Sequence, residues 1–335
     1  MKHKIIVTNI PAFYKINLYN EVSKSVKLTA VYTDINESDR NKDFVNGNMN
    51  FEHHFLEGSS LRKFYRLVSI LRKEYDELII GYWDSIMLIL IVFFSPMKKN
   101  SFVLESSYLE SNTSGLKGCV KRAFLRRISK VYASGKSQQK ILEKLDYRKE
   151  IVITKGVGVF NYIPQPKFAR RDHVKNFLYV GRFVEVKNLK FLISVFNNLP
   201  HLNLYLVGFG EQEEELKSMA KENIEFLGAV DNKKLYSVYQ SMDVFVLPSK
   251  IEPWGLVVEE ALNNGIPVLL SDRVGCVEEI VNDSNGIIFR YDDEIDLINA
   301  IKRLTDIEFY NSLRKNISMM NFKQIEKEQI ACYVK

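Results

Sequence analysis

The chain has 335 residues, of which 46% are apolar, so it can bury substantial cores, and its length predicts two domains. This composition excludes a disordered or a fibrous protein. The net charge of +6 is uneven, because residues 1–165 carry 26 Lys+Arg against 16 Asp+Glu (+10) and residues 166–335 carry 21 against 25 (−4). The basic first half indicates an anionic partner such as lipid headgroups, a phosphorylated acceptor or nucleic acid, although a solvated basic face would have the same composition.

The first half shows the pattern of a parallel sheet. Its opening stretch, MKHKIIVTNIPAF, has too short an apolar run for a secretory signal and is interpreted as a strand. Short β-branched runs then alternate with longer helical patterns, which is typical of βα units. The strands that we expect here cover residues 4–9, 26–33, 76–81, 101–104, 130–134 and 151–154.

Around Tyr162 the alternation stops, and NYIPQPKFARRDHVK has the composition of an interdomain linker. A second series of strands is expected over residues 176–181, 202–208, 224–228, 243–249, 266–271 and 286–289. We therefore predict an α/β protein with two doubly wound, Rossmann-like domains that face each other across a ligand-binding cleft. The expected boundaries are 1–163 and 164–318, with a C-terminal helix, 319–335, that crosses back to the first domain.

Three cysteines, Cys119, Cys276 and Cys332, lie far apart without CxxC spacing, which argues against a disulfide framework or a zinc site and fits a cytoplasmic setting. The longest apolar run, residues 86–94, is shorter than the roughly 20 residues that a membrane-spanning helix needs. We expect no transmembrane helix.

The stretch LKGCVKRAFLRRISKVYA (116–133) mixes cations with apolar residues. As a basic amphipathic helix it could lie on an anionic bilayer. Equally open is the alternative that Val120, Phe124 and Ile128 pack on the sheet while the cations face water. Residues 61–73, LRKFYRLVSILRK, repeat this composition.

Cations follow the first strand of the second half. Gly181 and Arg182 end the run NFLYVG-R, and Lys187 comes five residues later at the expected start of a helix. Arg and Lys just past the carboxyl end of a strand can converge on a diphosphate, but spacing alone leaves a solvated turn equally open. In the next loop Gly208 and Gly210 form half of a GxGxxG pattern, and the four glutamates that follow would repel a pyrophosphate, so we expect a tight turn there.

The stretch SKIEPWGLVVEEALNNGIPVLLS (249–271) holds Glu252 and Glu260, eight positions apart. Pro253 keeps Glu252 in a loop, and a helix of roughly ten residues is expected before Gly265. The N–H groups at its start, near Gly255, would form an anion-ready N-terminus.

Helical periodicity predicts two faces for this helix. The face expected to pack on the sheet consists of Val257, Val258, Ala261 and Leu262. The polar face consists of Glu259, Glu260, Asn263 and Asn264. Periodicity does not choose between Glu259 and Glu260, and on the residues alone a solvated carboxylate is the more ordinary interpretation of each.

Taken in order, six segments within residues 176–290 resemble the retaining nucleotide-sugar glycosyltransferases of family 4, which have the GT-B fold. The segments are FLYVGRFVEVKN, LYLVGFG, IEFLGAV, SMDVFVLPS, EPWGLVVEEALNNGIPVLLS and VEEIVNDSNGIIF. The most specific element is Glu-x7-Glu in the context S-x-x-E-P-x-G-L-V-x-x-E-A.

The resemblance implies roles for the matched positions. Arg182 and Lys187 would bind the donor diphosphate and stabilise the leaving nucleoside diphosphate. Glu252 would lie near hydroxyls of the transferred sugar, and Glu260, rather than Glu259, would bind the donor ribose. The further donor-binding positions are Gly181, Gly208, Ala229, Val230, Pro253, Trp254, Gly255 and Leu256. The resemblance implies that no metal or other cofactor takes part.

The chain departs from the family in two places. Gly275-Cys276 stands where a Gly-Gly pair is frequent, which puts a backbone contact at the second position in doubt. The first half lacks the glycine-rich first loop and the histidine found near the reacting centre of many members, since His53 and His54 lie elsewhere.

The loop NIPAFYKINLYNE (9–21) and the pair Glu105-Ser106 resemble relatives that build bacterial surface polysaccharides. We therefore assign the acceptor side to Tyr14, Lys15, Glu105 and Ser106. Glu105 would orient the acceptor hydroxyl or act as a base, and a merely structural loop carboxylate is equally open.

The resulting prediction is a retaining, metal-independent glycosyltransferase. It would move a sugar from a nucleoside-diphosphate sugar, UDP favoured over GDP, to a hydroxyl of a glycan or polyprenyl-diphosphate-linked acceptor in bacterial capsule, O-antigen or exopolysaccharide synthesis. The location would be cytoplasmic, with contact at the inner face of the plasma membrane through 116–133. Two alternatives are a nucleotide-sugar epimerase of related fold and a non-catalytic polyanion-binding protein. Nucleic acid is not expected, because no RNP-like strand or zinc pattern is present.

Overall fold

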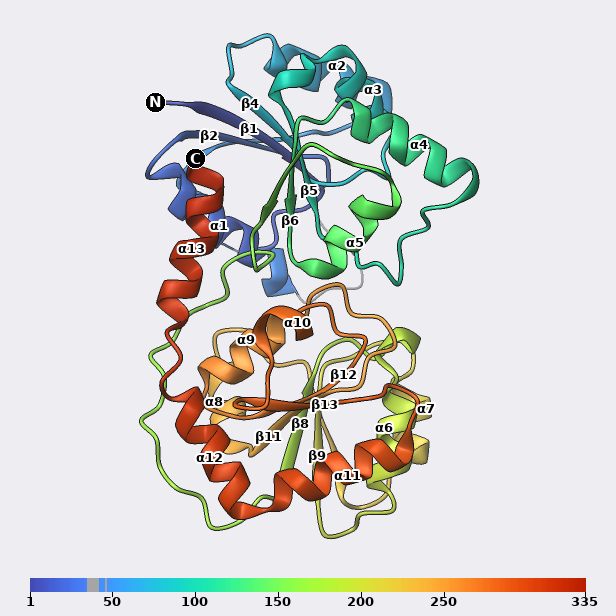
Figure 1. The fold of residues 1–335 in the computed structure, drawn as a ribbon, viewed down its shortest axis with the longest axis vertical. Helices are drawn as coiled ribbons and strands as arrows, with labels where there is room; N and C mark the ends of the chain where they lie inside the picture. The colour runs from blue at the N-terminus through green and yellow to red at the C-terminus, as the bar shows by residue number, and fades with distance from the viewer. Residues whose placement is uncertain (35–41, 46) are drawn as a thin grey trace. The chain divides into compact units, whose positions relative to one another are not determined.

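A computed structural model describes residues 1–34, 42–45 and 47–335. The chain divides into two compact units (Figure 1), of which unit 1 is Met1–Val159 with Lys323–Lys335 and unit 2 is Phe160–Phe322. Each unit contains one parallel sheet among helices. The predicted α/β class with two Rossmann-like units is confirmed.

The sheet of unit 1 has the order β3-β2-β1-β4-β5-β6-β7, with every pair of neighbours parallel. The strands are β1 (His3–Thr8), β2 (Lys27–Tyr32), β3 (Glu52–Phe55), β4 (Glu77–Ile80), β5 (Asn100–Leu104), β6 (Lys130–Ala133) and β7 (Glu150–Ile153). The strand order reverses between β1 and β4, and in open α/β sheets such a reversal leaves a crevice at the carboxyl ends of the two strands.

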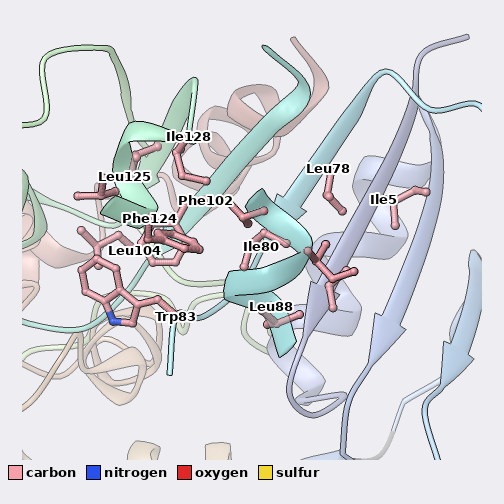
Figure 2. Close-up of a cluster of buried hydrophobic side chains, with 14 of the residues drawn as sticks. Ile5, Leu78, Ile80, Trp83, Leu88, Phe102, Leu104, Phe124, Leu125 and Ile128 are labelled. Carbon is pink, nitrogen blue, oxygen red and sulfur yellow. The ribbon is translucent and has the colours of Figure 1, made fainter. Parts of the chain in front are cut away.

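Alternate residues of the buried strands pack on opposite faces of this sheet. On one face, Ile5, Leu78 and Phe102 pack with α2 (Ser60–Leu71), α3 (Ile86–Phe94), α4 (Gly115–Arg126) and α5 (Lys136–Lys144). Figure 2 shows Leu88 of α3 and Phe124 of α4 among these strand residues. On the other face, Ile6 and Ile79 belong to a core with α1 (Phe13–Ser23) and α13 (Phe322–Val334). Short 3-10 turns, η1 (Lys42–Val45) and η2 (Met97–Lys99), complete the unit.

Strand β3 was missing from the sequence prediction. Its sequence, EHHF, has no apolar alternation, because it is an edge strand whose first residues, Glu52 and His53, are exposed. An edge strand with charged and polar side chains gives no periodic signal. The other strands of both units lie within two residues of their expected ends.

The sheet of unit 2 repeats the same winding with the order β10-β9-β8-β11-β12-β13. The strands are β8 (Asn176–Val180), β9 (Asn203–Val207), β10 (Ile224–Gly228), β11 (Val244–Leu247), β12 (Val268–Ser271) and β13 (Gly286–Phe289). The helices are α6 (Leu189–Phe196), α7 (Glu213–Met219), α8 (Leu235–Ser241), α9 (Leu256–Asn263), α10 (Val277–Ile280), α11 (Glu294–Thr305) and α12 (Ile307–Ile317), with the 3-10 turn η3 (Glu185–Lys187) before α6. Here the order reverses between β8 and β11.

The C-terminal helix α13 is tied to the sheet of unit 1. The buried Lys4 donates from Nζ to the backbone carbonyl of Tyr333 (2.7 Å) and forms an ion pair with Glu77 (2.9 Å). The Tyr333 ring stacks on Tyr132 with 4.7 Å between centroids, and Tyr132 donates to Glu77 (2.9 Å). Residues more than 300 positions apart therefore share one buried polar network.

Candidate active site

The predicted cations and the first motif glutamate come together at the strand reversal of unit 2. Arg182 and Lys187 follow β8, and Glu252 follows β11, and these two strands are hydrogen-bonded neighbours. Since the carboxyl ends of parallel strands meet at one edge of the sheet, this edge is where ligands of open α/β sheets bind.

Lys187 and Glu252 form an ion pair, although they are 65 positions apart in sequence. Both side chains are 13% exposed, so the pair is largely removed from water but reachable from the surface. A cation held at the edge of a sheet in this way can exchange its carboxylate for a phosphate oxygen.

Arg182 is half-buried and precedes Lys187 by five residues. Its backbone carbonyl accepts a hydrogen bond from the buried Tyr179 hydroxyl (2.8 Å), which fixes the turn after β8. The Arg182 guanidinium forms no hydrogen bond or ion pair with any residue that the structure describes. A positioned turn thus presents a cationic fork whose donors are available to an anion.

Gly208 and Gly210 are required by close packing of two loops, since a Cβ at Gly210 would lie 2.4 Å from the Phe183 carbonyl oxygen. A Cβ added at Gly208 would lie 1.8 Å from the Gly181 carbonyl oxygen, and its backbone has φ +139°. The Gly181 N–H donates to Val207 (3.0 Å), and the Phe183 N–H donates to Phe209 (2.8 Å). The loops after β8 and β9 are therefore in backbone contact. The Glu213 N–H donates to the Gly210 carbonyl (3.1 Å), which closes the tight turn that was expected there.

The loop that carries Glu252 is held by a second loop. Glu252 forms an isolated parallel bridge with Val274, and its carbonyl accepts from the Gly275 N–H (2.8 Å). A Cβ at Gly275 would lie 1.9 Å from the carbonyl oxygen of Pro253. The sequence analysis did not predict that position 275 requires glycine. The glycine in the pair Gly275-Cys276 was the signal that could have indicated it. Cys276, the departure from Gly-Gly, is fully buried and donates its N–H to Trp254 (2.9 Å).

Helix α9 begins at the position that the proline and glycine predicted. Its N-cap is Gly255, in the left-handed region with φ +95°, which favours glycine. Neither Gly255 nor Leu256 donates its backbone N–H to another residue in the described part of the chain. This helix start retains the unpaired donors that can bind an anion.

The predicted faces of α9 are wrong at four positions. Glu259 (4% exposed), Asn263 and Asn264 were assigned to the polar face but are buried, whereas Val257 is half-buried and so does not belong to the packed face. The Glu259 carboxylate accepts a hydrogen bond from the indole N–H of Trp254 (2.8 Å), which is itself buried. Hydrophobic periodicity did not predict the burial of Glu259, because a carboxylate can be buried when an interior polar group donates a hydrogen bond to it. The Trp254 ring is therefore part of the interior, and only its backbone is available at the surface.

Glu260 is half-buried and accepts a hydrogen bond from the Tyr239 hydroxyl of α8 (3.2 Å). Tyr239 was not predicted, because its sequence, LYSVYQS, carries no motif. Burial raises the pKa of Glu260 to about 7, against the lowering effect of the Tyr239 hydrogen bond. Burial also raises the pKa of Glu259 to about 8. The two neighbouring carboxyls thus differ in surroundings, and Glu260 is the one that is accessible.

The remaining donor-side positions lie at the same edge of unit 2. Ala229 and Val230 come directly after β10, with Ala229 exposed and Val230 half-buried. Pro253 is half-buried in the loop before α9. Backbone groups in these loops are accessible to a ligand at the carboxyl ends of the strands.

The four acceptor-side residues follow β1 and β5 in unit 1. Lys15 and Glu105 form an ion pair, with side chains 10% and 27% exposed. The Gln138 side chain donates to the backbone carbonyl of Glu105 (3.0 Å). Ser106, the next residue in the chain, is half-buried. The backbone carbonyl of Tyr14 accepts from Val159 (2.9 Å). The structure brings Lys15 and Glu105 together, and it gives Glu105 a structural partner as well as an accessible position.

Among the described residues, no group of three or more His, Cys, Asp and Glu side chains has the arrangement of a metal site. No helix in the described ranges combines the length and the apolar composition needed to cross a membrane.

Comparison with known proteins matches unit 2. The family model described as glycosyl transferases group 1 matches residues 164–321. The O-antigen biosynthesis glycosyltransferase WbnH of Escherichia coli is 33% identical over 175 residues, which cover 51% of this chain and 49% of that protein. A sulfoquinovosyl transferase of Arabidopsis thaliana, SQD2, is 33% identical over 38% of this chain and 26% of its own length. The matching part thus spans less than half of these curated relatives.

Solved structures match over nearly the whole chain. Sucrose-phosphate synthase from Thermosynechococcus elongatus has a TM-score of 0.76 at 17% identity and covers 98% of this chain and 97% of its own. Anabaena Alr3699/HepE in complex with UDP and glucose has a TM-score of 0.72 at 15% identity, covering 99% and 98%. At these identities the likeness shows the fold, which is the GT-B fold of glycosyltransferases.

Proposed function

We propose that this chain is a glycosyltransferase that moves a sugar from a nucleoside-diphosphate sugar to a hydroxyl group of an acceptor. The observation that carries the proposal is the convergence of Lys187, Glu252 and Arg182 at the strand reversal of unit 2, beside the unpaired N–H groups that begin α9. Such a site combines cations for a diphosphate with a carboxylate for sugar hydroxyls.

The chemistry at this edge is electrostatic. As the bond between the sugar and the diphosphate breaks, negative charge grows on the departing nucleoside diphosphate, and Arg182 and Lys187 stabilise it. Because Lys187 is paired with Glu252, the diphosphate takes the place of the Glu252 carboxylate on Lys187, and Glu252 becomes available to the transferred sugar. The acceptor oxygen bonds to the anomeric carbon on the face that the diphosphate leaves, and the departing diphosphate accepts the hydroxyl proton. Transfer with retention of the anomeric configuration and without a metal ion belongs to this proposal.

Glu260 is proposed to bind the donor ribose, with Tyr239 holding the carboxylate in place. The backbone of Ala229 and Val230 is proposed to meet the nucleobase, and UDP is favoured over GDP. The UDP bound in the HepE structure and the names of the matched enzymes support a nucleotide-sugar donor.

The acceptor is proposed to be a glycan or a polyprenyl-diphosphate-linked oligosaccharide of bacterial polysaccharide synthesis, in the cytoplasm. The O-antigen role printed for WbnH supports this class. Lys15 and Glu105 would lie on the acceptor side, with Glu105 orienting the hydroxyl. Contact of residues 116–133 with an anionic membrane also stays a proposal, and Leu116 and Val120 of this stretch are exposed.

Thermal unfolding in the presence of UDP, GDP, ADP and CDP tests the donor site. A ligand at about 100 times its dissociation constant stabilises the folded state by about 2.7 kcal/mol, which gives a measurable shift of the unfolding midpoint. We expect a shift with UDP that exceeds the shift with GDP. Absence of a shift with every nucleotide would contradict the proposal.

Two variants separate the roles of the motif glutamates. Glu260→Ala removes the ribose acceptor and is expected to weaken diphosphate binding by roughly tenfold, the cost of about 1.4 kcal/mol for one charge-assisted hydrogen bond. Glu252→Ala frees Lys187, so it is expected to leave nucleotide affinity unchanged or higher while transfer falls. Equal loss of nucleotide affinity in both variants would contradict these roles.

Release of an altered nucleotide sugar without any acceptor would favour an epimerase.

A further inference from the structure

Helix α3 exposes an apolar stripe. Ile86, Leu90, Phe93 and Phe94 follow the i, i+4, i+7, i+8 spacing of one helix face, and their exposed fractions are 78%, 43%, 44% and 81%. The opposite face packs into the core of unit 1 through Leu88 (Figure 2). A water-facing helix surface is normally polar, and a contiguous exposed apolar surface marks an interaction site.

The helices on either side of α3 extend this stripe. Figure 1 shows α2, α3 and α4 next to one another, and α3 contacts both of its neighbours. Each neighbour adds a pair at i, i+4 spacing, Leu61 and Tyr65 on α2 and Leu116 and Val120 on α4, with exposed fractions from 50% to 86%. We call the α3 stripe and these two pairs the outer patch.

The segments that carry the outer patch contain cations and no carboxylates. Residues 58–73, 85–104 and 111–142 hold no Asp or Glu, and they hold five, two and eight Lys or Arg respectively. Of these cations, Lys63, Lys73 and Lys130 form ion pairs with carboxylates of other segments. The two helices that flank α3, α2 and α4, thus carry Lys and Arg but no Asp or Glu. An apolar surface surrounded by cations complements a partner that is apolar inside and anionic at its boundary.

A cationic pocket of about 210 Å³ opens beside α4. Its charged lining consists of Arg122, Arg126, Arg148, Lys149 and one carboxylate, Asp146, which pairs with Arg148 (2.8 Å). Apolar side chains of Leu125, Leu145 and Tyr147 form the rest of its wall. The volume suits a small phosphate-bearing headgroup rather than a drug-sized ligand.

The pocket lies near the end of the α3 stripe, as two contacts that involve neighbouring residues show. The Lys149 Nζ lies 4.0 Å from the sulfur of Met97, the exposed first residue of η2, three positions after α3. Arg127, the residue that ends α4, donates to the carbonyls of Phe93 (3.1 Å) and Ser95 (2.8 Å). The end of the apolar stripe and the cationic pocket are therefore held together as one surface.

The cationic pocket lies away from the candidate acceptor side of unit 1. Lys149 comes directly before β7 and donates to the carbonyl of Ile128, before β6, so the pocket is at the amino ends of the strands. Lys15 and Glu105 come after β1 and β5, at the carboxyl ends. In a parallel sheet these are opposite edges, so the pocket is not part of the site already described.

We propose that the outer patch and the cationic pocket dock unit 1 on an anionic lipid bilayer. The α3 stripe enters the interface between headgroups and acyl chains, and the pocket binds the phosphate of an anionic headgroup. A second copy of this chain fits less well, because two cationic surfaces would repel each other. The phosphates of a nucleic acid would pair with the cations, but the aliphatic side chains of Ile86 and Leu90 would stay exposed to water.

Flotation with vesicles tests this docking. The whole chain is mixed with vesicles of phosphatidylcholine alone, and with vesicles in which one lipid in four is phosphatidylglycerol. We expect binding to the anionic vesicles that falls steeply with added salt, because screening weakens the attraction. Ile86→Ser with Phe94→Ser, and separately Arg126→Gln with Arg148→Gln, are each expected to weaken partition by about tenfold.

Matched variants on unit 2 serve as controls. Ile295→Ser with Met319→Ser removes apolar side chains of similar exposure, and Lys302→Gln with Lys315→Gln removes two exposed cations. Partition is expected to be unchanged in both. Absence of binding, equal binding to neutral and anionic vesicles, or equal losses in the control variants would overturn the proposal. The proposal would also be overturned if the chain did not bind vesicles but associated with itself, and if Ile86→Ser with Phe94→Ser abolished that self-association. The assay contains neither donor nor acceptor, so its outcome is independent of the proposed transfer.

Discussion

At the scale of single residues, the two adjacent glutamates of α9 differ in what surrounds them. Glu259 points into the interior and accepts from Trp254, whereas Glu260 is half-buried and accepts from Tyr239. Both carboxyls have a raised pKa because burial disfavours the charged form. Only Glu260 is placed to change its protonation state in contact with a ligand.

Nucleotide affinity is therefore expected to depend on pH through Glu260. Its pKa of about 7 is raised above the usual carboxyl value, so the neutral acid predominates below that pH and the carboxylate above it. Since a carboxylate accepts hydroxyl hydrogen bonds more strongly than the neutral acid, the affinity for UDP should rise by about threefold as the pH passes upward through this value. Calorimetric titration at several pH values measures the change.

The matched control is Glu260→Gln, which keeps an acceptor but does not titrate. Any slope left in this variant reports the ionisation of the nucleotide itself. If the variant and the unmodified chain have the same pH profile, Glu260 does not contact the ribose.

At the scale of elements, α13 completes the core of unit 1 from the far end of the chain. Tyr333 is 3% exposed and stacks on Tyr132, and its carbonyl accepts from the buried Lys4. Burial raises the pKa of Glu77, but the hydrogen bonds from Ser101, Lys4 and Lys130 outweigh it and lower that pKa to about 2. The carboxylate that organises this network is charged at neutral pH, and its contribution to stability is lost only as the pH falls below the ordinary carboxyl range toward 2.

Tyr333→Ala is expected to destabilise the chain by about 3 kcal/mol, because it leaves a cavity beside Tyr132. Denaturant unfolding measures this loss. Lys327→Ala, at an exposed position of the same helix, should change stability by less than about 0.5 kcal/mol. Similar small losses in both variants would mean that α13 does not pack on the sheet as described.

At the scale of the whole molecule, the two units have different chain continuity. Unit 2 is one continuous segment, Phe160–Phe322, while unit 1 needs both Met1–Val159 and the C-terminal Lys323–Lys335. The charges divide in the same way, with +10 on residues 1–165 and −4 on residues 166–335. A continuous unit with its own core can fold alone.

We therefore expect a fragment of residues 160–322 to fold and to bind UDP. A fragment of residues 1–159 lacks α13, leaves Lys4 and Tyr132 uncovered, and should unfold at a lower denaturant concentration than the same fragment linked to residues 323–335. Denaturant unfolding and UDP titration of the three fragments check this. A fragment of 160–322 that folds but does not bind UDP would place essential donor contacts outside unit 2.

The sequence by itself predicted the two parallel sheets and, among the described residues, every strand except β3, because hydrophobic periodicity is a local signal. The Glu-x7-Glu motif, also local, named the candidate donor residues, whose roles stay a prediction. It missed β3, whose edge position needs no apolar alternation, and it placed Val257, Glu259, Asn263 and Asn264 on the wrong faces of α9. Only the tertiary structure decided which charged groups meet, as in Lys187 with Glu252 and Lys15 with Glu105. Such pairs join residues far apart in the chain, and their geometry follows from how the strands are ordered in the sheet, which no local pattern encodes.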